Sequence, residues 1–226
     1  INFCCYPQKY WCKNLTFCDC KVTKYQGDKT IYYIINLLFI LKNRIFVMCD
    51  LQKERSMKIQ QRISDLREVM KREHLDAFVF PSTDPHNSEY VPDRWEGREW
   101  ISGFDGSAGT AVVTMTSAAL WTDSRYFLAA ADQLSGTEFQ LMKLKMPGTP
   151  SIAEWLGQEL RDKNGAQVGV DGMVNSTESV ESLITDLRRD GGITVRTNFD
   201  PLSIIWKDRP VVPQNKVEIQ SLKYAG

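Results

Sequence analysis

The stretch from Trp100 to Phe127, WISGFDGSAGTAVVTMTSAALWTDSRYF, constrains the fold of this chain more than any other segment does. Glycine and other small residues gather at its start, and glycine permits positive φ angles and close approach of the backbone. Two apolar runs, Thr110–Thr114 and Ala118–Thr122, follow with a short polar turn between them. This order predicts a Gly-rich loop that opens a β-hairpin.

The same glycines allow a phosphate-binding interpretation, which their surroundings oppose. A Walker loop needs glycine, lysine and a hydroxyl residue at the start of a helix, whereas these glycines lead into an expected strand without a lysine. We therefore expect Gly103, Gly106 and Gly109 to serve the backbone conformation and not to contact a ligand. At least one of the three should have a positive φ angle.

Hydrophobic patterns on either side of the hairpin predict alternating helices and strands. Apolar residues at helical spacing, from Ile59 to Met70, indicate a helix over Lys58–Glu73. Further strands are expected at 76–80, 138–143, 167–171 and 193–197, and further helices at 127–134, 152–162 and 177–189. This alternation predicts an α/β fold, with a mixed β-sheet flanked by helices and mainly parallel in its second half.

Residues 1–56 differ in composition from the rest of the chain. They contain nine Lys and Arg, four Asp and Glu, all six cysteines and no alanine. The remainder is mildly acidic and free of cysteine, which argues against a nucleic-acid-binding face and against a thiolate metal site. We expect residues 1–56 to be upstream sequence translated in frame, not a domain, with Met57 as the natural start.

Three functional interpretations of residues 1–56 remain open beside that one. The first is a membrane span over Ile31–Met48, although its apolar core has 11 residues, where a span needs about 20. The second is a secretory signal, but no small-x-small cleavage site follows the apolar tract. The third is a zinc site, although Cys18 and Cys20 lack the usual ligand spacing.

Three ordered motifs carry a family resemblance. They are PSTDPHNSEY at 81–90, GFDGSAGTA with WTDSRYF at 103–127, and IIWKDRP at 204–210. Together they resemble the creatinase/aminopeptidase P amino-terminal domain, as found in the longer, three-domain, cytosolic type of Xaa-Pro aminopeptidase. Creatinase and prolidase share the fold but match these motifs less well. The resemblance implies a domain over 57–210, followed at 211–226 by a linker and the start of a second domain.

The resemblance also implies a function for the complete protein. The family removes the amino-terminal residue that precedes proline, so the expected substrate is a peptide with proline at its second position. Two divalent metal ions, Mn or Zn, are expected in a carboxy-terminal catalytic domain, where they activate water. A homodimer and a cytoplasmic location are implied, with no membrane or nucleic-acid partner. No stretch of this chain matches the catalytic domain, so we expect the chain alone to be inert and to hold no metal.

Two residues are candidates for substrate binding. Arg125 occupies the position of the family's substrate-binding arginine, and its guanidinium presents a fork of donors to a carboxylate or carbonyl. From the residues alone, a structural pair with Asp123 is the alternative. His86 lies in a long polar loop, 82–95, whose counterpart in the family lies near the subunit contact and the active-site mouth. A metal site formed by Asp84, His86 and Glu89 is the alternative, although its spacing matches no usual ligand arrangement.

Two further interpretations stay open. Trp95 and Trp100 alternate with Arg94 and Arg98, which predicts a solvated edge with two partly buried rings or, alternatively, a set of interface anchors. At the level of the whole chain, the alternative to an enzyme's front domain is a stand-alone, non-catalytic binding or dimerisation module of the same fold.

The composition break predicts the outcome of limited proteolysis on the full chain. Protease should remove residues 1–56 and leave a core that begins close to Met57, because a segment that does not form a domain is readily cleaved. Mass spectrometry of the digest identifies the boundary. A protected core that extends into residues 10–40 would contradict the prediction.

Overall fold

A computed structural model describes residues 29–212, 214, 216 and 218–224. The chain divides into two compact units, Ile1–Val47 and Met48–Gly226. Within the first unit only residues 29–47 are described, and they are helical. The cysteines considered for a zinc site, at 4–20 and 49, lie outside the described side chains. The architecture below is that of the second unit.

Helix α1 spans Lys29–Arg72 and so begins well before the predicted start at Lys58. Residues 29–57 contain neither proline nor glycine, so no residue in that stretch ends the helix. The predicted apolar stripe is confirmed, since Ile59, Ile63 and Met70 are at most 1% exposed. Among residues 29–212, no helix has the length and hydrophobicity that crossing a membrane requires.

The sheet has six strands in the order β4-β3-β2-β1-β5-β6. Their bounds are β1 Ala77–Phe80, β2 Thr110–Thr114, β3 Ala118–Thr122, β4 Phe139–Lys143, β5 Gln167–Val170 and β6 Thr194–Arg196. Strand β2 is antiparallel to β1 and β3, while β1 with β5, β5 with β6 and β3 with β4 pair in parallel. The predicted mixed sheet and its hairpin are confirmed, and every strand except β2 ends at the same edge.

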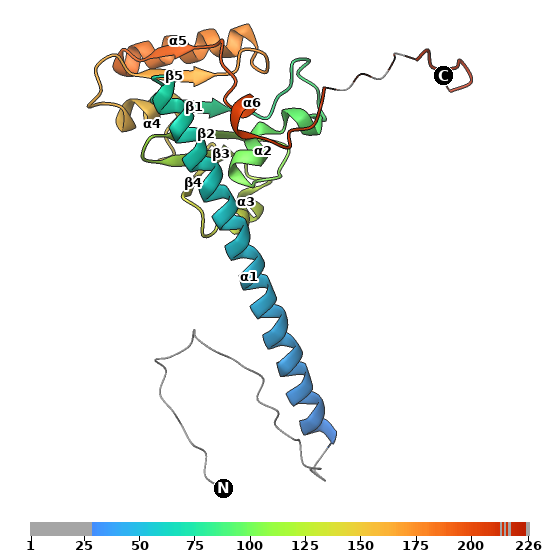
Figure 1. The fold of residues 1–226 in the computed structure, drawn as a ribbon. Helices are drawn as coiled ribbons and strands as arrows, with labels where there is room; N and C mark the ends of the chain where they lie inside the picture. The colour runs from blue at the N-terminus through green and yellow to red at the C-terminus, as the bar shows by residue number, and fades with distance from the viewer. Residues whose placement is uncertain (1–28, 213, 215, 217, 225–226) are drawn as a thin grey trace. The chain divides into compact units, whose positions relative to one another are not determined.

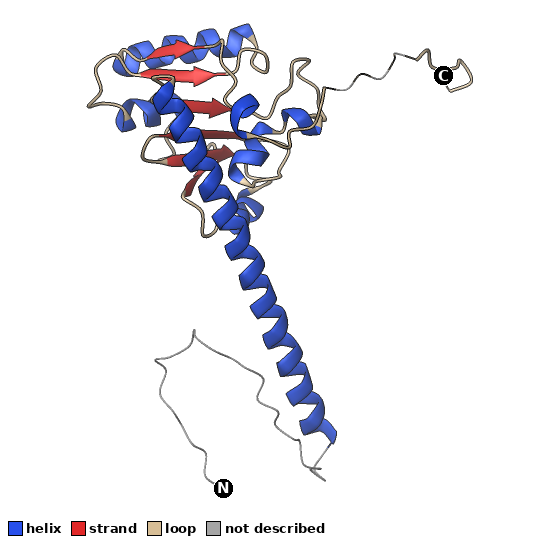
Figure 2. Ribbon diagram, viewed as in Figure 1, coloured by secondary structure: helices blue, strands red, loops and turns tan. Residues whose placement is uncertain are grey.

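Helices cover both faces of this sheet (Figure 1, Figure 2). The remaining helices are the 3-10 helix η1 Asp93–Trp95, α2 Gly97–Ser102, α3 Phe127–Gln133, α4 Ile152–Glu159, α5 Thr177–Gly191 and α6 Leu202–Ile205. One core cluster joins α1, α2, α3 and α6 to the sheet, and the other joins α4 and α5 to it. Along β1 the side chains alternate, with Phe78 and Phe80 in the first cluster and Val79 in the second.

Stacked rings and guanidinium groups fasten the end of the domain to its beginning. The Trp100 and Trp206 rings stack with their centroids 5.2 Å apart, and the guanidinium of Arg62 lies 4.5 Å from the Trp100 centroid. Arg209 lies over both Trp206 and Trp95. These contacts join α1, η1, α2 and the segment after α6, so the rings hold the domain together.

Arg98 departs from the predicted solvated edge because its side chain is buried. The residue is 1% exposed, and its Nη1 donates a hydrogen bond of 2.5 Å to the carbonyl oxygen of Phe104. Its guanidinium also lies 5.0 Å from the Phe104 ring centroid. A buried arginine needs such partners, because an unpaired charge in the interior is costly. Arg98 therefore holds the start of the Gly-rich loop through its contacts with Phe104.

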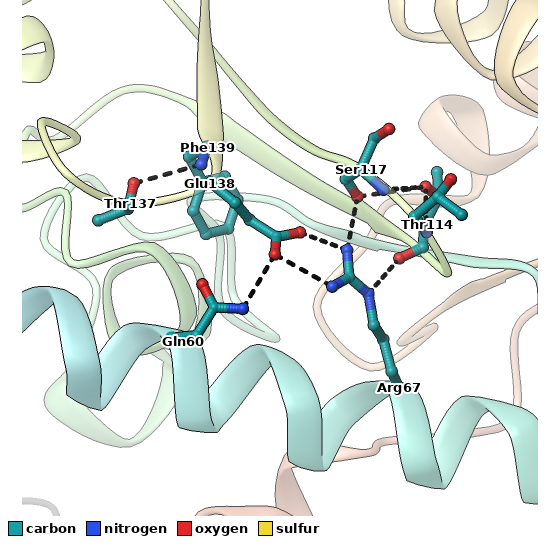
Figure 3. A network of polar contacts seen from close by, with 8 residues as sticks. Gln60, Arg67, Thr114, Ser117, Thr137, Glu138 and Phe139 are labelled. Carbon is teal, nitrogen blue, oxygen red and sulfur yellow. Dashed lines mark hydrogen bonds and ion pairs between the residues drawn. The ribbon is translucent and has the colours of Figure 1, made fainter.

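A second polar contact fastens α1 to the hairpin and to β4 (Figure 3). Arg67 Nε donates to the carbonyl oxygen of Thr114 at 2.8 Å, and Arg67 also forms a two-pronged ion pair with Glu138. Gln60 Nε2 donates to the same carboxylate at 3.1 Å. Arg67 is 18% exposed at its side chain, so water screens this contact only partly.

Removing this contact should destabilise the domain. Arg67→Ala should lower the free energy of unfolding by about 2 kcal/mol, since hydrogen bonds to charged groups are lost. Arg161→Ala is the matched control, because Arg161 pairs with Asp162 at a side-chain exposure of 77% and should cost less than about 0.5 kcal/mol. Urea denaturation measures both, and equal losses would show that the Arg67 contact has no special weight.

Candidate functional site

The Gly-rich loop, residues 103–109, lies between the carboxyl ends of β1 and β3, because it opens β2 and β2 runs between them. Ser82, after β1, donates from Oγ to the carbonyl oxygen of Gly109 at 2.7 Å. Thr122, at the end of β3, donates from Oγ1 to the carbonyl oxygen of Ala108 at 2.6 Å. The loop is therefore held from both sides at the sheet edge where α/β proteins commonly bind ligands.

The glycines of this loop are required by the backbone. Gly103 has φ 75°, which confirms the prediction that at least one of them adopts a positive φ. A Cβ on Gly109 would lie 2.9 Å from the carbonyl oxygen of Trp121, and one on Gly106 would lie 2.3 Å from the Phe104 ring. Gly106 and Gly109 leave no room for a side chain, and Gly103 has a positive φ angle, so these constraints explain the three glycines.

Arg125 lies just after β3, at the same sheet edge. Its Nε donates to Asp123 Oδ1 at 3.0 Å, and its Nη2 donates to Asp123 Oδ2 at 2.8 Å. This hydrogen bond lowers the pKa of the Asp123 carboxyl and raises that of the Arg125 guanidinium. The Arg125 side chain is 67% exposed, so the pair adds little to stability.

The pair with Asp123, the alternative considered from the sequence, does form, and it leaves part of the guanidinium open. Within the described residues, Nη1 of Arg125 has no hydrogen-bond partner. The carboxylate therefore binds one side of the guanidinium without using all of its donors. A peptide carbonyl or carboxylate could accept a hydrogen bond from the remaining nitrogen.

His86 lies in the loop after β1, where Asp84 organises the backbone. Asp84 is 3% exposed, and its Oδ1 accepts hydrogen bonds from the backbone N–H of His86 at 2.9 Å and of Ser88 at 3.0 Å. The Ser88 hydrogen bond is the main reason that the pKa of Asp84 is low. The side chain of His86 is exposed.

The structure places His86 and Arg125 on one sheet edge without joining them. Strand β2 and the Gly-rich loop lie between the ends of β1 and β3, and no contact links the two side chains within the described residues. The metal alternative for the His86 loop is not supported by geometry. No group of three or more His, Cys, Asp and Glu among the described residues is arranged to hold a metal ion.

Two functional candidates, Ser107 and Tyr126, were missed in the sequence. The hydroxyl oxygens of Ser107 and Tyr126 lie 2.7 Å apart, and this hydrogen bond lowers the pKa of the Tyr126 phenol. The Arg125 guanidinium lies 5.2 Å from the Tyr126 ring centroid. Ser107 belongs to the motif GFDGSAGTA and Tyr126 to the motif WTDSRYF. Because they lie 19 positions apart in the sequence, their contact could not be read from either motif.

Several exposed apolar side chains belong to segments that leave the same edge of the sheet. Within residues 57–210, Met57 on α1 is exposed, and the other exposed large hydrophobic residues lie on the segments that follow β1, β3, β4 and β5. They are Tyr90, Leu128, Leu144, Met146 and Met173. Where such side chains form one contiguous patch, they mark a surface that another molecule or domain covers.

Comparisons with known proteins point to one family. The family model described as Creatinase/Prolidase N-terminal domain matches residues 62–203. A probable Xaa-Pro aminopeptidase P of Aspergillus flavus is 40% identical over 167 residues, which cover 74% of this chain and 25% of the relative. Aminopeptidase P2 of Arabidopsis thaliana is 38% identical over 172 residues, which cover 74% of this chain and 24% of the relative.

A solved structure agrees with these sequence relatives. The X-prolyl aminopeptidase of Caenorhabditis elegans, described as a cytosolic enzyme with a di-nuclear active site, aligns with a TM-score of 0.63 and 30% identity. The alignment covers 70% of this chain and 27% of that structure. The chain thus spans about a quarter of the length of the curated relatives it matches.

The close approach at Gly109 predicts the cost of adding a methyl group there. Gly109→Ala should lower the free energy of unfolding by about 2 kcal/mol, because the methyl group would press on a backbone atom of β3. Gly157→Ala, within α4, is the control and should raise it by about 0.5–1 kcal/mol. Urea denaturation of both variants measures the difference, and a neutral Gly109→Ala would show that the loop has spare room.

Proposed function

Because the chain belongs to the creatinase/prolidase amino-terminal domain family, we propose that it is the non-catalytic front domain of a Xaa-Pro aminopeptidase. The observation that carries the proposal is the 40% identity to an Xaa-Pro aminopeptidase P over 167 residues. The complete enzyme would remove an amino-terminal residue that precedes proline. We further propose a cytoplasmic homodimer that acts without a membrane or nucleic-acid partner.

The chemistry of bond cleavage belongs to the rest of the enzyme. Two divalent metal ions, Mn or Zn, would activate water there, and the solved relative is described as having a di-nuclear active site. Among the described residues, no cluster of carboxylates, imidazoles and thiols fits such ions. We therefore assign no metal-dependent step to this chain. Its proposed part is to bind and orient the peptide.

Arg125 would carry that role. Asp123 holds its guanidinium by two hydrogen bonds, while the side chain is 67% exposed and one nitrogen stays open. That nitrogen can donate to a backbone carbonyl or a carboxylate of the peptide. His86, on the same edge, would supply a second polar contact. The apolar side chains along this edge would lie against the catalytic part of the enzyme or a second subunit.

The proposed domain is residues 57–210, and two residues before it also contact it. Arg55 donates to the carbonyl oxygen of Gly103, and Ser56 donates to that of Gly136. We therefore extend the proposed domain to include these two positions and keep the rest of 1–56 outside it. The described residues among 211–224 form neither helix nor strand, as a linker would.

The role of Arg125 can be tested in a grafted enzyme. Met48–Gly226 of this chain would replace the corresponding domain of the C. elegans aminopeptidase, which is 30% identical. Arg125→Ala should lower kcat/KM for an Ala-Pro-Leu peptide by about tenfold, because a charge-assisted hydrogen bond is lost. Arg125→Lys should recover little, since a point charge does not replace the fork.

Controls separate substrate contact from folding. Arg161→Ala removes an arginine of similar exposure, 77%, and should leave kcat/KM unchanged. Thermal unfolding of every variant should stay close to that of the parent, because the Arg125 pair is exposed. If Arg125→Ala unfolds the domain or leaves peptide turnover unchanged, Arg125 is structural. The assignment of Arg125 as a peptide contact would then be wrong, provided that the grafted parent enzyme is itself active.

A further inference from the structure

We infer that Tyr126 is a positioning residue for Arg125, and that Ser107 of the Gly-rich loop holds Tyr126 in place. The inference rests on the proposed role of Arg125 in peptide binding. Three contacts form the chain of support. The Ser107 and Tyr126 hydroxyl oxygens lie 2.7 Å apart, the Tyr126 ring meets the Phe104 ring edge-on at 5.9 Å, and the Arg125 guanidinium lies 5.2 Å from the Tyr126 centroid.

Asp123 alone does not determine where the Arg125 guanidinium lies. The Arg125 side chain is exposed at 67%, while that of Asp123 is partly buried at 32%. Exposed ion pairs exchange readily with water and contribute little free energy. An aromatic ring beside the guanidinium adds a second, independent contact through its π face. The carboxylate and the ring together restrict the guanidinium more than either does alone.

The Tyr126 ring is itself fixed by the Gly-rich loop. A Cβ on Gly106 would lie 2.8 Å from Tyr126 Cδ1, so the ring packs directly on the loop backbone. Phe104, which is fully buried, supports the ring from the core. Ser107 then holds the phenol oxygen at the outer end of the ring. The ring therefore has an apolar support at one end and a hydrogen bond at the other.

This arrangement gives a physical reason for the joint presence of two sequence motifs. GFDGSAGTA supplies Phe104, Gly106 and Ser107, and WTDSRYF supplies Arg125 and Tyr126. The loop would thus act on the substrate through the arginine and without touching the peptide. The simpler alternative is that Tyr126 only packs against Phe104 at the start of α3. The two accounts differ in what the Ser107 hydrogen bond does.

Two conservative variants remove that hydrogen bond and keep the ring. Tyr126→Phe deletes the phenol oxygen, and Ser107→Ala deletes its partner. Ser124→Ala is the matched control, since Ser124 is exposed in the same turn and makes no hydrogen bond within the described residues. The readout is hydrogen exchange of the Arg125 Nε–H, followed by NMR in the full, isotope-labelled 226-residue chain.

Exchange of the Arg125 Nε–H should be about threefold faster or more in Tyr126→Phe and in Ser107→Ala, the size expected when one hydrogen bond is lost. The double variant should match the single ones, because both remove the same bond. Ser124→Ala should exchange as the parent does. Unchanged rates in Tyr126→Phe and Ser107→Ala would overturn the inference, even if Arg125→Ala still impaired the grafted enzyme.

Kinetics in the grafted enzyme separate this inference from the proposed function. Tyr126→Phe should raise KM for the Ala-Pro-Leu peptide by about threefold. In an Arg125→Ala background the same change should have no further effect, because the residue acts through Arg125. An added effect in that background would overturn the positioning role. Failure of Arg125→Ala alone to lower kcat/KM would instead overturn the proposed role of Arg125 in peptide binding.

Discussion

The reversed direction of one strand, β2, is the constraint on which the rest of this domain depends. Because β2 runs antiparallel between β1 and β3, the loop that opens it lies at the edge where its neighbours end. If β2 were parallel to β1 and β3, a crossover connection would be needed to join β2 to β3. The hairpin instead delivers the Gly-rich loop to the carboxyl edge of the sheet. Hydrogen bonds from Ser82 and Thr122 then hold the loop between the two strand ends.

Side-chain contacts also hold the opposite end of the hairpin. Arg67 reaches from α1 to the Thr114 carbonyl and to the Glu138 carboxylate, so helix, hairpin turn and the start of β4 are joined by one side chain (Figure 3). The stacked Trp100 and Trp206 rings fasten the closing segment to α2. These contacts are partly buried and join elements that are far apart in the sequence. They lie on segments other than those that carry His86 and Arg125.

The charged groups of the candidate site are more accessible to water than the Arg67 contact is. Asp123 and Arg125 form a well-oriented pair that contributes little to stability. Their value lies in orientation, since one guanidinium nitrogen remains open beside a ring that is held by the Gly-rich loop. In the proposed role, such a half-site would bind a peptide only weakly by itself. A second surface, offered by the catalytic part of the proposed enzyme, would complete it.

The sequence by itself determined the α/β class, the hairpin, the helical stripe from Ile59 to Met70 and the family, because these depend on local periodicity and short motifs. It led to the hypothesis that Arg125 and His86 bind substrate, but it did not give their relative positions. The tertiary structure alone decided that β2 separates them. It also decided that Arg98 is buried and that Ser107 bonds Tyr126. Contacts between residues distant in sequence depend on how elements pack, and no local pattern encodes that packing.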